Sequence, residues 1–144
     1  MLIRPLLIAS ALLLGGCDRA PSAPDIAVSD AWARATAAGQ SNAAVYATIA
    51  NRGSADRLTG VTSSAGMAML HASESSGGMA RMRMISDLAI PAGGEVQLAP
   101  GGTHVMLTGL EAPLRAGDRL QLTLRFATAG LRTVDVAVVA AGER

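Results

Sequence analysis

Apolar and polar residues alternate with a period of two in many segments after position 25, which is the pattern of half-buried β-strands. The clearest case is residues 119–126, where three Leu and a Phe alternate with Arg, Gln and Thr. The same alternation returns at residues 132–139, after a short segment at 128–130 that is typical of a hairpin connection. These residues predict two antiparallel strands joined by a tight turn.

Shorter segments of the same kind recur along the rest of the chain and are separated by Gly, Pro, Asn and Asp. The pattern predicts nine strands, at residues 26–34, 43–51, 57–62, 67–71, 79–85, 95–98, 104–110, 119–126 and 132–139. Turns are predicted at residues 51–53, 91–94, 100–102 and 117–118. No stretch of twelve residues after Cys17 has helical periodicity. We therefore expect an all-β fold, a mostly antiparallel β-sandwich.

Composition limits the size of the molecule and the kinds of partner. The 144 residues suffice for one domain, and with one Trp, one Tyr and one Phe the core must be built from Val, Leu, Ile, Ala and Met. All 12 basic residues are Arg, and the net charge is only +1. A near-neutral chain with no basic run and almost no stacking aromatics argues against a nucleic-acid partner.

The first seventeen residues have the features of an export signal. Arg4 is followed by an apolar run over residues 6–14 and then by small residues that end at Cys17. The run is short for a permanent membrane span, so residues 1–16 are predicted to be a cleaved signal peptide. Residues 14–17 (LGGC) also resemble the bacterial lipobox, which predicts that Cys17 carries a lipid. The alternative is an ordinary signal peptide with an incidental cysteine.

A lipidated Cys17 would divide the rest of the chain into two parts. Residues 17–25 contain Pro and Ala without apolar periodicity and are expected to form a flexible tether. Residues 26–144 then form the folded domain. The protein is expected to be periplasmic and anchored to the bacterial membrane by its lipid. Asp18 resembles the signal by which some Gram-negative bacteria retain lipoproteins in the inner membrane.

The residues with ligand chemistry are concentrated in one part of the chain. Both histidines and six of the seven methionines lie between Met67 and Met106. His104 and Met106 are two residues apart in a predicted strand, so their side chains share a face. His71 ends another predicted strand, and Met82 lies in the next one. Imidazole and thioether together favour a soft cation, Cu(I) first, whereas zinc more commonly recruits Cys or carboxylate.

The spacing of four of these residues resembles the signature of the PCu(A)C family of periplasmic copper chaperones, written H(M)X10MX21HXM. Ten residues separate His71 from Met82, twenty-one separate Met82 from His104, and one separates His104 from Met106. The segments DAWARAT at 30–36, NRGSADRL at 51–58 and IPAGGEVQLAPGGTHVMLTGL at 90–110 also read like that family. The resemblance covers residues 26–139.

The resemblance implies a cupredoxin-like antiparallel β-sandwich that holds one Cu(I) near its surface. Its ligands would be His71, Met82, His104 and Met106. The implied role is to carry copper in the periplasm and to deliver it to the dinuclear copper site of cytochrome c oxidase, on subunit two. An alternative function is a lipid-anchored copper-buffering module without a dedicated transfer partner.

The remaining residues of this region favour structural roles. A core or rim position is expected for the methionines outside the motif, which are Met67, Met69, Met79 and Met84. Met79 or Met84 could also form an apolar wall beside the copper. Arg81 and Arg83 should point away from the face of Met82, and Trp32 should be a packing anchor.

The sequence does not favour an enzyme. A hydrolytic triad would have to reuse a histidine of the motif. A blue-copper redox site would need a cysteine ligand, and the one cysteine is the predicted lipid anchor.

Overall fold

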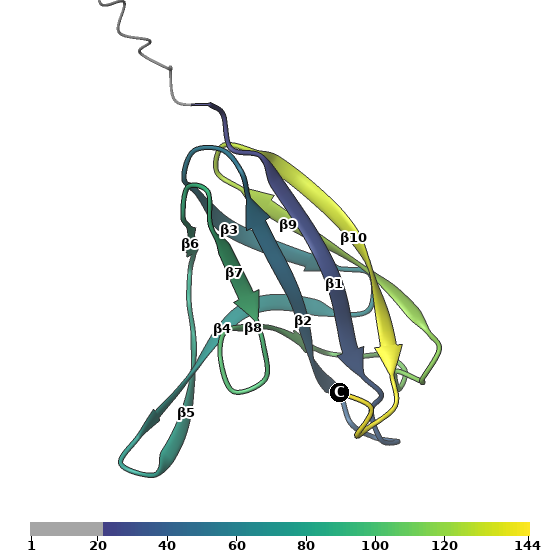
Figure 1. Ribbon diagram of the computed structural model, residues 1–144. Helices are drawn as coiled ribbons and strands as arrows, with labels where there is room; N and C mark the ends of the chain where they lie inside the picture. The colour runs from purple at the N-terminus through teal and green to yellow at the C-terminus, as the bar shows by residue number, and fades with distance from the viewer. Residues whose placement is uncertain (1–21) are drawn as a thin grey trace, which may run out of the picture.

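The computed structural model describes residues 22–144 (Figure 1). The predicted signal peptide and Cys17 lie outside the described residues. The described chain forms ten strands: β1 (Ile26–Arg34), β2 (Asn42–Asn51), β3 (Asp56–Ser63), β4 (Met67–Ser76), β5 (Met79–Met84), β6 (Leu88–Ile90), β7 (Glu95–Leu98), β8 (His104–Thr108), β9 (Arg119–Phe126) and β10 (Gly130–Val139). No helix in residues 22–144 has the length and apolar character needed to cross a membrane.

The strands form one continuous sheet that folds over a shared core. Its order is β5-β4-β8-β2-β1-β10-β9-β3-β6. β7 and β8 share one edge of β2: β8 pairs with residues 42–45 of β2 and β7 with residues 47–50. The β1–β10 pair is parallel, and the other pairs between strands of residues 22–144 are antiparallel. The predicted all-β, mostly antiparallel sandwich is therefore confirmed, with β1 and β10 side by side in Figure 1.

Alternation along the strands builds the core. In β9, Leu120, Leu122, Leu124 and Phe126 are buried, while the residues between them face outward. The buried hydrophobic residues of the described chain are aliphatic apart from Phe126 and Tyr46, and they include no methionine. Sequence reasoning was therefore right about the aliphatic core and wrong to include methionine in it.

A β-bulge in β1 sets which side of that strand faces the core. Asp30 has a positive φ of 51°, and the pairing with β2 shifts register between Ser29 and Trp32. The extra residue reverses the alternation. Ile26 is buried before the bulge and Ala33 after it, so Trp32 lies on the outer face.

One difference from the predicted strands concerns the region around His71. β4 continues to Ser76 instead of ending at residue 71, and it pairs with β5 as a hairpin that projects from the sandwich (Figure 1). All six residues of β5 are exposed. The hairpin beyond the core has no buried face, so no alternation of buried and exposed residues marked the extension of β4. The three-residue β6, which pairs with β3, was not predicted.

Buried polar side chains fix the end of the sandwich where the described chain begins, opposite the projecting hairpin (Figure 1). Asn51 is 2% exposed, and its Oδ1 accepts hydrogen bonds from the backbone N–H groups of Asp25 and Gly53. Its Nδ2 donates to the carbonyls of Ser54 and Pro91. One side chain thereby joins the chain entry, the β2–β3 turn and the β6–β7 turn.

Asp56 plays a similar part at the same end. Its carboxylate accepts hydrogen bonds from the backbone N–H groups of Arg57, Thr128 and Ala129 at 2.8–2.9 Å. Burial opposes ionisation of this group, but the backbone hydrogen bonds outweigh burial and lower the pKa of Asp56 below its ordinary value. The ionised Asp56 thus attaches the β9–β10 turn to the start of β3.

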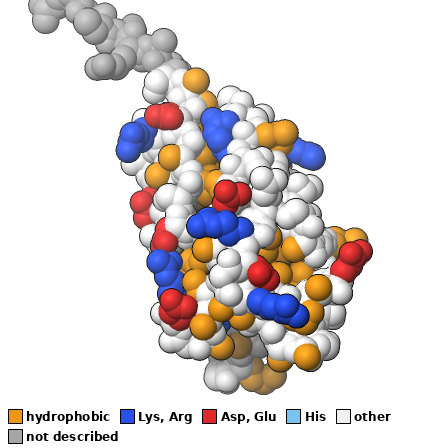
Figure 2. All heavy atoms as spheres, turned by 90° about the vertical axis from the view of Figure 1, so that its right-hand side faces the viewer, with side chains coloured by type: hydrophobic (Ala, Val, Ile, Leu, Met, Phe, Trp, Pro, Cys, Tyr) orange, Lys and Arg blue, Asp and Glu red, His pale blue; other side chains and the backbone are white. Residues whose placement is uncertain are grey.

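The outer surface carries both signs of charge. On the face shown in Figure 2, acidic and basic side chains are interspersed among uncharged ones. This distribution agrees with the net charge of +1.

Candidate metal centre

Strands β4 and β8 place the two histidines side by side. His71 is directly opposite His104 in the register, and their ring centroids are 6.0 Å apart. Met69 is opposite Met106 in the same pair of strands. Residues opposite each other on antiparallel strands share a face, so all four side chains project from the face away from the core. Their neighbours Leu70 and Val105 are buried on the core side.

Strand β5 brings Met82 to the same face. Met82 is opposite Ser73, which follows His71 by two residues on β4. A cavity of about 360 Å³ is lined by Met82, His104 and Met106, together with Tyr46 and Ser73. The structure therefore gathers the four residues of the motif on one face of β4, β5 and β8, which we call the site face. Met82 is 57% exposed and lies at the outer rim.

His104 is held in one orientation by its own loop. The side chain is 5% exposed, and its Nδ1 lies 3.0 Å from the carbonyl oxygen of Gly102. A carbonyl only accepts hydrogen bonds, so Nδ1 carries the proton and Nε2 keeps its lone pair for a ligand. Gly101, with a φ of 78°, allows the tight turn that places this carbonyl. This arrangement is the usual support of a metal-binding histidine.

His71 differs from His104 in having no hydrogen-bond partner. Both of its ring nitrogens are buried, and neither forms a hydrogen bond with any residue of 22–144. A buried polar group without a partner costs about 1–3 kcal/mol. A nitrogen lone pair buried beside a second imidazole is suited to a metal ion that would replace the missing hydrogen bond.

Aromatic rings extend the row of imidazoles across the sheet. Tyr46 lies 6.3 Å from His104 between ring centroids, and Trp32 lies 4.6 Å from Tyr46. The guanidinium groups of Arg34 and Arg144 lie 5.6 and 5.7 Å from the Trp32 ring centroid. Trp32 therefore packs as an anchor, as predicted, and Tyr46 forms a wall beside His104 that sequence reasoning did not identify.

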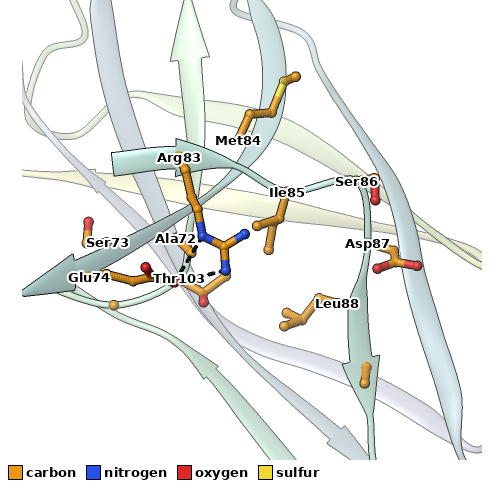
Figure 3. Close-up of a pocket in the computed structure, with 12 residues that line it drawn as sticks. Ala72, Ser73, Glu74, Arg83, Met84, Ile85, Ser86, Asp87, Leu88 and Thr103 are labelled. Carbon is orange, nitrogen blue, oxygen red and sulfur yellow. Dashed lines mark hydrogen bonds and ion pairs between the residues drawn. The ribbon is translucent and has the colours of Figure 1, made fainter. Parts of the chain in front are cut away.

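The other side of the β4–β5 hairpin is polar and carries no histidine or motif methionine. A groove of about 650 Å³ lies there, and Figure 3 shows Arg83 and Ile85 pointing into it while Met84 points to the opposite side of β5. Arg83 forms an ion pair with Glu74 at 2.9 Å. Alternation along β5 places Arg81 on the side of Arg83. Both arginines thus point away from the face of Met82, as predicted.

Two methionines outside the motif also belong to the site face. Met84 is directly opposite His71 and is 67% exposed, and Met69 is opposite Met106. Sequence reasoning assigned both a core or rim position, and the structure excludes the core. Period-two spacing in MAMLH (67–71) and MRM (82–84) was a signal that could have placed them beside the motif residues.

The chemistry of the site face is that of a soft ligand set. In the described part of the chain, no three side chains among His, Cys, Asp and Glu come together. The site face instead presents two imidazoles surrounded by thioethers. Such donors match Cu(I) among the biological metals.

Comparison with known proteins places the chain in a family. The family model LpqE-like matches residues 26–138. A protein of Leifsonia xyli subsp. xyli named "Putative lipoprotein Lxx21020" is 40% identical over 119 residues, which covers 81% of this chain and 70% of that protein.

Solved structures of PCuAC domains have the same fold. The copper-bound PCuAC domain from PmoF2 has a TM-score of 0.68 and 29% identity, and the match covers 83% of this chain and 96% of that domain. The Cu(I) form of DR1885 from Deinococcus radiodurans has a TM-score of 0.59 and 31% identity, covering 90% of this chain and 84% of that protein. The chain therefore belongs to the LpqE-like family and is a PCuAC protein with the cupredoxin-like β-sandwich that its sequence predicted.

Proposed function

We propose that this protein is a Cu(I) carrier whose metal ligands are His71, Met82, His104 and Met106. The observation that carries the proposal is the pair of imidazoles at 6.0 Å, one of them with both ring nitrogens buried and unpartnered within residues 22–144. The copper-bound PmoF2 domain, 29% identical to this chain, and the Cu(I) form of DR1885, 31% identical, support copper as the cargo.

The exposure of the ligands is suited to transfer of the metal. His104 is buried and fixed by Gly102, whereas Met82 is more than half exposed on the projecting hairpin. A partner protein could displace Met82 first while the imidazoles still hold the ion. Stepwise exchange of this kind avoids releasing free Cu(I), and the neutral thioether leaves without a change in protonation.

We also propose that the carrier is exported and tethered to the membrane through a lipid on Cys17, with residues 17–25 as a tether and the inner membrane as its location. The LpqE-like family match and the lipoprotein name of the Leifsonia relative support an anchor. The proposed acceptor is the dinuclear copper site of cytochrome c oxidase subunit two, as the family resemblance implies.

Affinity measurements test the ligand assignment. We expect His104→Ala or Met106→Ala to lower the Cu(I) affinity at least tenfold, about 1.4 kcal/mol. The measurement is anaerobic competition with a chromophoric Cu(I) chelator, in a chain that carries Cys17→Ser so that no thiol competes. Met79→Ala is the control, because Met79 is 61% exposed and lies on the other side of β5. Binding that neither site variant weakens would refute the assignment.

Transfer is tested separately from binding. The Cu(I)-loaded protein is mixed with the soluble copper domain of oxidase subunit two, and the metal content of each is measured after separation. Copper that moves to the oxidase domain supports delivery. Copper that stays on the carrier in both reducing and oxidising buffers would support buffering instead.

A further inference from the structure

The methionines of this protein are distributed as ligands would be and not as packing residues would be. Five of the six in the described chain lie on the site face, by register and alternation along the strands: Met67, Met69, Met82, Met84 and Met106. None belongs to the buried core of residues 22–144, and several are more than half exposed. An exposed methionine gains little free energy from burial. Packing therefore does not explain why methionine stands at these positions.

Two methionines outside the proposed ligand set come together next to His71. Met84 is directly opposite His71 on β5, and Met69 precedes His71 by two residues on β4. Met69 and Met84 are therefore diagonal neighbours across the strand pair, within reach of two long side chains. Both also line one cavity of about 200 Å³ at the edge of the sheet, whose other walls include Leu70 from the core side of β4 and Ile85 from the far side of β5.

We propose that Met69 and Met84 form a second Cu(I) site, composed of thioethers, beside the imidazole pair. Cu(I) binds soft sulfur ligands. Two neutral sulfurs offer fewer donors than the four-ligand site, so the second ion binds more weakly than the first. The cavity is open to solvent through Met84, which is 67% exposed.

The role of the second site rests on the proposed function. Met84 lies beyond His71 on the exposed edge strand, so an ion held there sits between a docking partner and the imidazoles. We infer that the thioether pair is a stepping position by which Cu(I) enters or leaves the main site.

Cu(I) titration tests the second site directly. The full chain carrying Cys17→Ser is titrated anaerobically with Cu(I) against a chromophoric chelator. We expect two equivalents, the second bound at least tenfold more weakly than the first. The double variant Met69→Leu/Met84→Leu keeps apolar side chains of similar volume without sulfur. It should lose the second equivalent and keep the affinity of the first within threefold.

Matched controls separate this proposal from the proposed function. Met79→Leu changes an equally exposed methionine on the other side of the same hairpin and should leave both equivalents unchanged. His104→Ala should weaken binding of the first equivalent and leave binding of the second unchanged. If it weakens neither, the ligand assignment of the main site is wrong while the second site stands. The second site is refuted if only one equivalent binds, if the double variant keeps two, if it loses the first, or if Met79→Leu has the same effect.

Discussion

The two ends of the sandwich differ in how completely their buried polar atoms are hydrogen-bonded. At the end where the described chain begins, Asn51 and Asp56 use their side-chain oxygens and nitrogen in seven hydrogen bonds to backbone groups. At the site end, His71 has two buried ring nitrogens and makes no hydrogen bond to residues 22–144. The first end stabilises the fold, whereas the second leaves donors available to a ligand at some cost in stability.

The largest effect is expected at Asn51. Asn51→Ala removes the partners of two backbone N–H groups and two carbonyls in a buried position, so the free energy of unfolding should fall by about 3 kcal/mol. Chemical denaturation of the apo protein measures this loss. Asn42→Ala, in the same strand but exposed, is the matched control and should change stability by less than about 0.5 kcal/mol. Equal losses in the two variants would remove the distinction between the ends.

Asp56 should show a smaller effect that depends on pH. In Asp56→Asn an NH₂ group replaces one carboxylate oxygen, so at least one backbone N–H, such as that of Ala129, loses its acceptor. The free energy of unfolding should fall by about 2 kcal/mol at pH 7. Because the folded protein lowers the pKa of Asp56, its contribution is complete above the unfolded value of 3.8 and is lost as pH falls through the lower folded pKa.

Unfolding curves measured between about pH 6 and pH 2 test the sign of this dependence. The original protein should lose stability on acidification more steeply than the Asp56→Asn variant. Parallel pH profiles for the two proteins would show that Asp56 does not gain stability from ionisation in the fold.

The smallest effect on stability is expected at His71. His71→Leu removes two buried nitrogens that have no partner among the described residues, so the apo protein should be as stable as before or more stable by about 1 kcal/mol. Thermal unfolding without copper provides the measurement. His104→Leu is the comparison, because it removes the hydrogen bond to Gly102 and should destabilise. A loss at His71 as large as that at His104 would mean that His71 supports the fold.

The sequence predicted nine of the ten strands, including the fully exposed β5, and missed β6 and the second half of β4. β7 and β9 match the predicted bounds, because alternation of more and less buried residues marks them. The second half of β4 lies in the projecting hairpin, where no core imposes alternation, and β6 is only three residues long. These elements depend on pairing with distant strands, which a local pattern does not contain.

The candidate site shows a similar division. The resemblance to the family signature identified the four motif residues, and the register places them on one face. The approach of Met84 to His71 and of Tyr46 to His104 depends on which strands become neighbours. Neither contact could be read from spacing along the chain, because the strand order β5-β4-β8-β2 is set by the whole fold.

X-ray absorption at the copper edge tests the central claim most directly. The sample is the Cys17→Ser, Met69→Leu, Met84→Leu chain loaded with one equivalent of Cu(I), so that only the main site is observed. Two nitrogen and two sulfur neighbours are the predicted result. A copper ion surrounded by sulfur alone, or by nitrogen and oxygen alone, would contradict the assignment of His71, Met82, His104 and Met106 as its ligands.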